Sequence, residues 1–166
     1  MNSLKLAITK SKIFEHLFSV FLFNIFFISI LIFLLIFKSN IFIIIILFIF
    51  TLLQLLPSIF LYLNYKNING NQIIEITNNQ IKIENLTTLR HSELDLNEEV
   101  KIILTAVFAA QLLHINFKYF CIKNEFGEIY YFTSLLDRFE DLDIYLSKYG
   151  YETNSVWFPF IPIDKK

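Results

Sequence analysis

The fold is decided by two apolar runs: residues 17–37 read LFSVFLFNIFFISILIFLLIF, and residues 41–63 read IFIIIILFIFTLLQLLPSIFLYL. Eighteen residues in each run are Ile, Leu, Phe or Val, and Lys38 is the only charged residue in or between them. Either run is long enough to cross the ~30 Å hydrocarbon layer of a bilayer as an α-helix. A helix also satisfies every backbone polar group within lipid. The sequence therefore predicts two transmembrane helices.

A short linker, residues 38–40, joins the two runs, so we expect the helices to lie antiparallel in one transmembrane hairpin over residues 13–63. The alternative for the first run is a cleaved signal peptide, because residues 1–12 carry three lysines ahead of an apolar stretch. That stretch is longer than the apolar core of a signal peptide, and no Ala-x-Ala cleavage site follows it. We therefore expect the first run to remain as a helix.

The lysines outside the apolar runs predict the orientation of the hairpin. Residues 1–12 form a basic N-terminal flank, whereas the linker holds Lys38 alone and Lys66 follows the second run. Positively charged residues are enriched on the cytoplasmic side of membrane helices. We therefore expect a multi-pass protein of the cell (inner) membrane, integral to the lipid bilayer, with both termini in the cytoplasm. The single Cys121 agrees with a compartment in which disulfides are rare.

Two amides lie at similar depths in the predicted hairpin. Asn24 precedes Ser39 by fifteen residues and Gln54 follows it by fifteen, so antiparallel helices place both side chains at one level. Polar groups in lipid are costly and usually find a partner. One interpretation is a hydrogen bond between Asn24 and Gln54 that joins the helices. The other is a polar patch for a transported solute or a partner helix; the lack of deep ionisable residues favours the first.

Residues 70–150 have the patterns of a small strand-rich domain. Apolar residues alternate with polar ones, or gather in short runs between turn residues, as is typical of strands. The Asn78-Asn79 pair favours a tight hairpin turn, because asparagine tolerates positive φ. Five segments hold the expected strands: residues 72–85 (a hairpin), 88–96, 100–104, 113–121 and 129–132. They make about six strands, in an antiparallel sheet or a partly open barrel.

A C-terminal amphipathic helix is predicted over residues 135–149. Its Leu, Phe and Tyr residues recur at steps of three and four, which makes an apolar stripe. Ser134 with Asp137 resembles a capping box at the start, and Gly150 is suited to the left-handed conformation that follows a helix end. A sheet covered by one helix gives an α+β domain after the transmembrane α-helical hairpin.

The order of these elements, with a strand hairpin that reads FCIKNEFGEIYYF at residues 120–132, resembles a known architecture. It is similar to bacterial membrane proteins that carry a pleckstrin-homology-like (PH-like) domain after a helical hairpin, including the YcxB-like group. The resemblance covers residues 13–150 in the order of elements. It implies a small barrel-like sheet of seven strands closed by a C-terminal helix, and a binding or scaffolding role without a catalytic site.

The sequence offers no catalytic, cofactor-binding or metal-binding constellation. His16, His91 and His114 lack the spacing of metal ligands, and one cysteine cannot form a thiolate cluster. The three glycines do not form a phosphate-binding loop. From Lys66 onward, ten Lys or Arg stand against fourteen Asp or Glu, which argues against nucleic acid as a partner. We therefore expect a protein without a cofactor and without enzyme activity.

Two segments depart from the pattern of the domain. Residues 106–113 are small and apolar, and predict either a buried strand continuation or a loop that dips into the membrane interface. Residues 151–166 predict an extended tail, because they hold two prolines among aromatics. Its Trp157, Phe158 and Phe160 are candidates for contact with the membrane interface, where Trp is favoured. Packing of the tail over the domain's own sheet is the alternative.

Together these patterns predict a membrane-anchored, non-enzymatic binding or scaffolding module. Its sheet domain is expected to bind a partner protein or a second copy of the chain. The alternative is an accessory or regulatory subunit of a membrane transport or enzyme complex, to which the hairpin contributes. Co-purification in mild detergent separates the two, because only the alternative requires a stoichiometric membrane partner.

Overall fold

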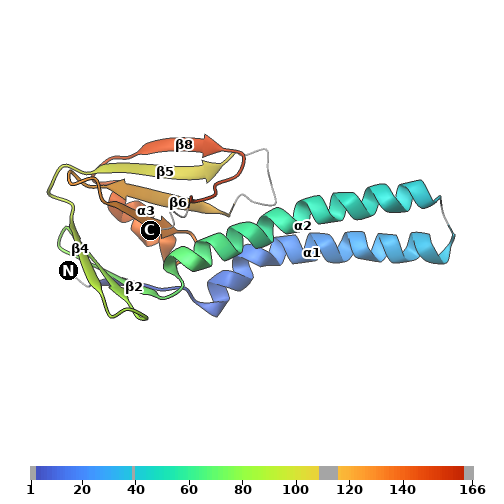
Figure 1. The fold of residues 1–166 in the computed structure, drawn as a ribbon, viewed down its shortest axis with the longest axis horizontal. Helices are drawn as coiled ribbons and strands as arrows, with labels where there is room; N and C mark the ends of the chain where they lie inside the picture. Colours follow the sequence, from blue (N-terminus) through green and yellow to red (C-terminus); the bar gives the residue numbers. More distant parts are fainter. Residues whose placement is uncertain (1–2, 39, 109–115, 163–166) are drawn as a thin grey trace.

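The computed structural model of the protein describes residues 3–38, 40–108 and 116–162, apart from the side chains of Ser19 and Gln54. Two long helices project from a domain of two sheets and one short helix (Figure 1). The α+β class is therefore confirmed. The described helices are α1 (Lys10–Ile36), α2 (Ile41–Asn69) and α3 (Phe139–Leu146). The described strands are β1 (Leu4–Leu6), β2 (Gln72–Thr77), β3 (Gln80–Asn85), β4 (His91–Asp95), β5 (Lys101–Val107), β6 (Lys118–Lys123), β7 (Ile129–Thr133) and β8 (Glu152–Val156).

Helices α1 and α2 lie side by side and run in opposite directions (Figure 1). Polar caps set their starts: Thr9 Oγ1 accepts a backbone hydrogen bond of 3.3 Å at α1, and Asn40 Oδ1 accepts one of 2.9 Å at α2. α1 is bent by 44° between Lys10–Phe18 and Val20–Ile36. The first of these segments carries contacts to the domain, and the second runs along α2.

Apolar side chains on the helix pair are largely exposed. α2 is long and apolar enough to cross a membrane, and only 12% of its most apolar stretch is buried by the rest of the protein. α1 meets the same test only if its two bent segments count as one span. A helix in the core of a soluble domain would be mostly buried. That the pair spans a membrane stays a prediction, and this exposure is what supports it.

The first sheet has the order β1-β2-β3-β4 and is antiparallel. Its central hairpin confirms the prediction for residues 72–85, and both Asn78 and Asn79 have positive φ. β1 pairs with β2 along residues 4–6, so part of the predicted basic flank is a strand of the domain. The sequence could not show this strand, because three residues are too few to establish an alternating pattern.

The second sheet has the order β7-β6-β5-β8, in which β8 runs parallel to β5 and the other pairs are antiparallel. β8 lies in the segment predicted as an extended tail, residues 151–166. Its sequence, ETNSV, is too polar to resemble a strand, and the pairing with β5 depends on residues about fifty positions away. The described strands number eight in two sheets of four, without barrel closure, which corrects the expectation of about six.

One apolar core joins both sheets and α3. Ile74 and Ile81 come from the first sheet, Phe120 from the second and Leu142 from α3, and all four are fully buried. The ring of Phe120 stacks on that of Phe139 in α3, with centroids 5.3 Å apart. Burial of such side chains contributes about 1.5–3 kcal/mol each, so this core gives the domain its main stabilisation.

α3 is shorter than the helix predicted over residues 135–149. It starts only at Phe139, because Arg138 has a φ of 56°, which is left-handed. Leu136 lies before it in a turn and forms an isolated antiparallel bridge with Ile8. Leu135, the first residue of the predicted stripe, is fully buried in a cluster with Tyr65 and Phe117, so its apolar side chain extended the stripe beyond the true helix.

Two predicted segments are only partly covered by the described residues. β5 continues to Val107, so the start of the segment 106–113 is a strand, as one of its two interpretations held. β6 begins at Lys118, within the strand expected over residues 113–121. Residues 109–115 of these two predictions lie outside the described part of the chain, and Phe108, Asn116 and Phe117 are described but belong to no strand.

Candidate functional site at the junction of helices and domain

The junction is the region in which the end of α2 and the first segment of α1 pack against the second sheet. Leu61 and Tyr65 of α2 are fully buried there, in a cluster with Phe117, Leu135 and Ile161. The rings of Tyr65 and Phe117 meet edge to face, with centroids 5.6 Å apart. α2 therefore passes from an exposed apolar surface into the domain within about one turn.

A strap that follows β8, residues 157–162, is held on α2 by three hydrogen bonds. The buried amide of Asn64 donates to the Ile161 carbonyl at 2.9 Å and accepts from the Ile161 N–H at 2.9 Å. The Tyr65 hydroxyl donates to the Pro159 carbonyl at 3.0 Å. These bonds satisfy backbone groups that burial would otherwise leave without partners. They fix the strap at one level of the helix.

The last residue of α2 is fastened to the second sheet. Asn69 is fully buried, and its amide nitrogen donates to the Tyr131 carbonyl at 3.0 Å and to the Gln72 side chain at 2.9 Å. Its amide oxygen accepts from the Thr133 N–H at 2.9 Å. Next to it, Gly70 leaves no room for a side chain, since an added Cβ would overlap the Lys66 carbonyl oxygen. The helix thus enters the domain in one fixed position.

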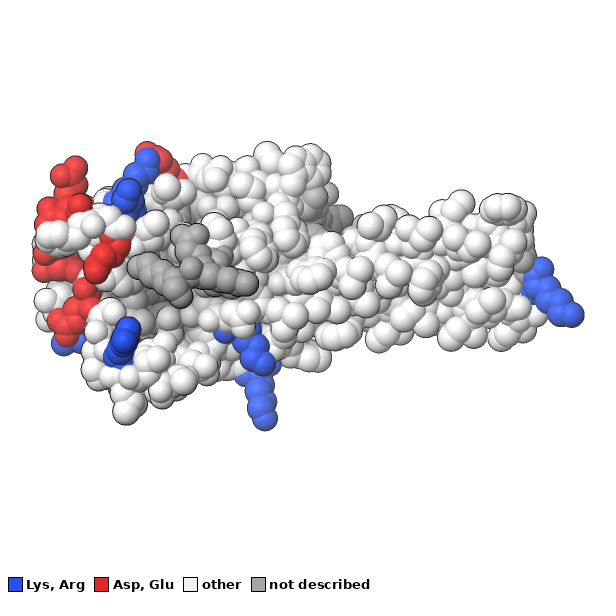
Figure 2. Space-filling view, viewed as in Figure 1, with Lys and Arg blue, Asp and Glu red and all other residues white. Residues whose placement is uncertain are grey.

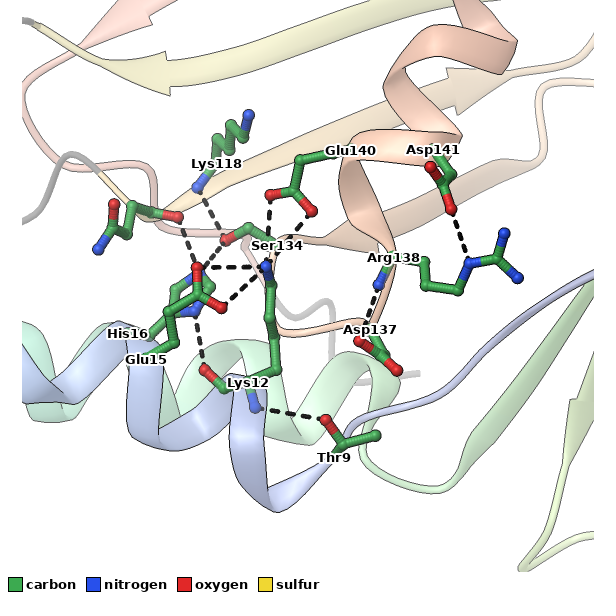
Figure 3. A network of polar contacts seen from close by, with 11 residues as sticks. Thr9, Lys12, Glu15, His16, Lys118, Ser134, Asp137, Arg138, Glu140 and Asp141 are labelled. Atoms are coloured by element: carbon green, nitrogen blue, oxygen red, sulfur yellow. Dashed lines mark hydrogen bonds and ion pairs between the residues drawn. The ribbon is translucent and has the colours of Figure 1, made fainter.

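His16 joins the first segment of α1 to the domain (Figure 3). Its ring is buried, with Nδ1 3.0 Å from the Lys12 carbonyl oxygen and Nε2 2.9 Å from the Asn116 carbonyl oxygen and 3.0 Å from Ser134 Oγ. Burial lowers the pKa of His16, although both carbonyls favour the charged ring. In the neutral ring only one nitrogen can donate: with the proton on Nδ1, which donates to the Lys12 carbonyl, Nε2 accepts from the Ser134 hydroxyl.

Lys12 lies beside His16 and bridges α1 to α3 (Figure 3). Its Nζ is 3.1 Å from Glu15 and 3.3 Å from Glu140, which is the second residue of α3. Burial lowers the pKa of Lys12, but the hydrogen bond with Glu15 and the charge of Glu140 outweigh it and raise the pKa. Burial likewise opposes ionisation of Glu140, yet its backbone hydrogen bond and the Lys12 charge lower the pKa overall.

These contacts make a mechanical connection between the helix pair and the domain. Both helices contribute side chains, α1 through Lys12 and His16 and α2 through Asn64 and Asn69. Their partners in the domain are backbone groups and Glu140. The side chains at the junction that titrate are engaged in ion pairs or carbonyl contacts. Cys121, a potential nucleophile elsewhere in the domain, is half-buried, and burial raises the pKa of its thiol. His16 and Ser134 form a hydroxyl–imidazole contact of 3.0 Å, but both side chains are buried, and Ser134 Oγ also accepts a hydrogen bond from the Lys118 N–H.

Asn24 is buried between the helices, as the predicted intramembrane contact requires. Its amide nitrogen donates to the Val20 carbonyl at 2.7 Å, within α1. Its amide oxygen is buried without a hydrogen-bond partner among the described residues. The side chain of Gln54 lies outside what the structure describes, so the proposed bond between the two amides stays a prediction.

The aromatic residues singled out in the tail are exposed. Trp157, Phe158 and Phe160 follow β8, with exposed fractions of 66%, 39% and 46%. Phe158 and Phe160 stack in parallel, and Trp157 contacts Phe108 at the end of β5, with ring centroids 5.6 Å apart. The structure thus brings a fourth aromatic residue into a group that the sequence suggested as three.

The sequence did not identify the polar residues of the junction. Lys12 and His16 are four positions apart ahead of the first apolar run, which places them on one face of a helix. Asn64 and Asn69 lie just after the second run, where a helix usually leaves the membrane. These spacings were the available signal, but they do not reveal partners about 60 to 130 positions away.

An open hollow of about 350 Å³ lies on the outer face of the first sheet. A row of alternating charges crosses it, because Lys5 pairs with Glu75, Glu75 with Lys82, and Lys82 with Glu93 in the strand registers. Lys82 and Glu93 form an ion pair of 3.1 Å. Within residues 3–38, 40–108 and 116–162, no group of three or more His, Cys, Asp or Glu is arranged to hold a metal ion.

Comparison with known proteins gives no further guide to the site. No family model, no curated protein and no solved structure matches this chain. The resemblance to YcxB-like membrane proteins therefore stays a prediction, and the junction is interpreted from its own geometry.

Proposed function

We propose that this protein is a membrane-anchored, non-enzymatic scaffold. The helix pair crosses the cell (inner) membrane twice, both termini face the cytoplasm, and the domain is held against the cytoplasmic end of the hairpin. The outer face of the first sheet is presented to a partner protein or to a second copy of the chain. The observation that carries this proposal is the hydrogen-bonded junction beneath an exposed apolar helix pair.

The dimensions of the helix pair support a membrane crossing. From Ile41 to Leu63, α2 exposes apolar side chains over twenty-three residues, which is about 35 Å of helix. This length is enough to cross the ~30 Å hydrocarbon layer of a bilayer. The domain holds α2 through the buried Asn64 and Tyr65, directly after that stretch. The protein surface therefore changes from apolar to polar at the depth where lipid gives way to water.

The distribution of charge supports the same placement. Figure 2 shows acidic side chains gathered at the end of the domain farthest from the helix pair, with basic ones among them, and other basic side chains at the helix tip and near the start of the pair. Lys10, Lys12 and Lys66 lie at the domain end of the helices, against Lys38 alone at the tip. This excess favours a cytoplasmic domain.

The fixed junction distinguishes a scaffold from a loosely tethered domain. Asn64, Asn69 and His16 each bond to domain backbone from a buried position. A buried group that loses its partner costs about 1–3 kcal/mol, so the domain cannot swing free without breaking several such contacts. The outer face of the first sheet is thereby held at a set distance from the membrane, as a scaffold requires.

Site-specific photocrosslinking in cells tests the proposal. The photoreactive residue p-benzoylphenylalanine would replace Ser92, an exposed residue of the hollow on the first sheet. The matched control replaces Glu125, which is exposed in the turn between β6 and β7. We expect a discrete adduct from position 92 and none from position 125, and its mass tells a second copy from another protein. Equal labelling at both positions, or none at position 92, would contradict the proposal.

A third photocrosslinking position tests the alternative, in which the protein is an accessory subunit of a membrane complex. Phe48 is 53% exposed in the middle of α2, where only lipid or another membrane helix can reach it. A stoichiometric adduct from position 48, together with none from position 92, would favour the accessory-subunit role. An adduct from position 92 alone supports the scaffold.

A further inference from the structure

Four exposed aromatic side chains gather where β5 and β8 end, and we call them the aromatic patch. Phe108 follows β5 and contacts Trp157, which follows β8, while Phe158 and Phe160 stack beside each other on the strap. Their exposed fractions run from 39% to 66%. The Phe108 N–H bonds to the Val156 carbonyl at 3.1 Å, so the two strand ends are tied together. Exposed groups of this kind commonly mark a protein or membrane contact.

We propose that the aromatic patch rests in the headgroup region of the leaflet that the hairpin enters, so that the domain contacts the bilayer at a second place. The proposal rests on the membrane crossing of the helix pair proposed above. It adds a lipid-binding surface on the domain itself, with the lipid interface as its occupant.

The depth of the patch follows from its attachment to α2. The strap bonds to Asn64 and Tyr65, the two residues that follow Leu63, where the exposed apolar stretch of about 35 Å ends. With Ile41 at the far boundary of the ~30 Å hydrocarbon layer, Asn64 lies about 5 Å beyond the near boundary. The headgroup layer on each side of the hydrocarbon is roughly 5–7 Å thick. The strap is therefore tied to α2 within the headgroup layer.

The direction in which the second sheet points agrees with this depth. In Figure 1 the arrowheads of β5 and β8 point the same way as the projecting helix pair, so the patch lies at the membrane end of the sheet. The strand registers confirm which end this is, since Val107 pairs with Val156 at the end opposite the turn between β6 and β7. The patch faces the bilayer and not the cytoplasm.

The chemistry of the strap fits lipid. Residues 157–162 read WFPFIP and carry no charge. Its prolines lack the N–H groups that would need partners at an apolar surface, and Asn64 satisfies the N–H of Ile161. Tryptophan is enriched at the membrane interface because its ring is both apolar and able to donate a hydrogen bond. The strap is also hydrogen-bonded to α2 directly after the exposed apolar stretch of that helix, which favours lipid over a separate protein partner.

The chain carries its own reporter for this contact, because Trp157 is the only tryptophan. The full chain would be reconstituted in phosphatidylcholine vesicles, with and without lipid brominated near the top of one acyl chain. We expect blue-shifted Trp157 emission that loses most of its intensity in the brominated vesicles and resists quenching by aqueous acrylamide. Water-like emission that bromine leaves unchanged would overturn the proposal.

A matched control moves the reporter to the opposite end of the sheet. In the double variant Trp157→Phe, Phe126→Trp, the tryptophan sits in the turn between β6 and β7, where Phe126 is 75% exposed. We expect no bromine quenching from this position. Quenching at both positions would indicate adsorption of the whole domain, and would contradict a defined patch.

Vesicle flotation and carbonate extraction separate this inference from the proposed function. If the chain floats and resists extraction but Trp157 is not quenched, the result supports the membrane crossing and contradicts lipid contact by the aromatic patch. A chain that extraction releases overturns both proposals.

Discussion

Asn64 and Ile161 are 97 residues apart in the sequence and are joined by two hydrogen bonds of 2.9 Å, one in each direction. Asn64 lies in α2 and Ile161 in the strap, and both are buried. A side-chain amide thus pairs with both polar groups of one backbone residue, as a neighbouring strand would. This pairing ties the C-terminal part of the chain to the helix that leads into the domain.

Replacing Asn64 with Ala should destabilise the junction. The backbone N–H and carbonyl of Ile161 lose their partners in a buried place, so we expect a loss of about 2–4 kcal/mol in the free energy of unfolding. The measurement is denaturant unfolding of the full chain in mild detergent, followed by circular dichroism. Asn67→Ala is the matched control, because Asn67 is exposed on the same helix, and it should change stability by less than ~0.5 kcal/mol. Equal effects of the two substitutions would contradict the pairing.

Gly70→Ala tests the fit at the end of α2. A Cβ at this position overlaps the Lys66 carbonyl oxygen, so the helix end must shift against the buried Asn69. We expect destabilisation of about 1–3 kcal/mol, as for other overpacked sites. Asn71→Ala, at the exposed neighbouring position, serves as the control in the same unfolding experiment. A Gly70→Ala variant as stable as the parent chain would show that the helix end has more freedom than described.

The burial of His16 predicts a dependence of stability on pH. Its pKa in the folded chain is lowered from 6.5, so below that pH the unfolded chain binds a proton that the folded chain resists. The contribution of His16 is therefore fully present above pH 6.5 and is lost as the pH falls toward the lowered value. We expect the melting temperature to fall between pH 7.5 and 5.5, and His16→Gln to flatten that fall. His91→Gln, on the exposed face of β4, should keep the slope of the parent chain.

The Lys12 and Glu140 pair should contribute only modestly. Glu140 is 61% exposed at its side chain, and solvent screens such a pair. A double-mutant cycle with Lys12→Gln and Glu140→Gln should give a coupling energy of about 0.5–1 kcal/mol, with both single variants folded. The coupling should weaken in high salt. A coupling near zero at low salt would mean that α1 is held to α3 by packing and by His16 alone.

Sequence patterns identified the elements that depend on local chemistry. The hairpin of β2 and β3 was predictable because Asn78 and Asn79 supply the positive φ that its turn needs. The two long helices were predictable from apolar length, and each of the five expected strand segments overlaps at least one of the strands β2 to β7. In each of these segments, the residues that predict the element are the same residues that form it.

The elements that the sequence missed depend on distant partners. β8 is polar and becomes a strand through parallel pairing with β5, and β1 does so through pairing with β2. Leu135 resembled a helical residue because it is apolar and buried, although it lies before α3 and packs with Tyr65 of α2. At the junction, Asn64 bonds to a residue 97 positions away, and His16 bonds to residues at least 100 positions away. Sequence periodicity can indicate that a face is buried, but it does not identify the residues that cover it.

The orientation of the hairpin and its domain is tested most directly by cysteine labelling in intact cells. Single cysteines at Asn40, in the turn between the helices, and at Glu152, at the start of β8, would be placed in a Cys121→Ser background that removes the only native thiol. A membrane-impermeant maleimide should label position 40 in intact cells and position 152 only after permeabilisation. Labelling of position 152 in intact cells would contradict a domain held at the cytoplasmic face of a transmembrane hairpin.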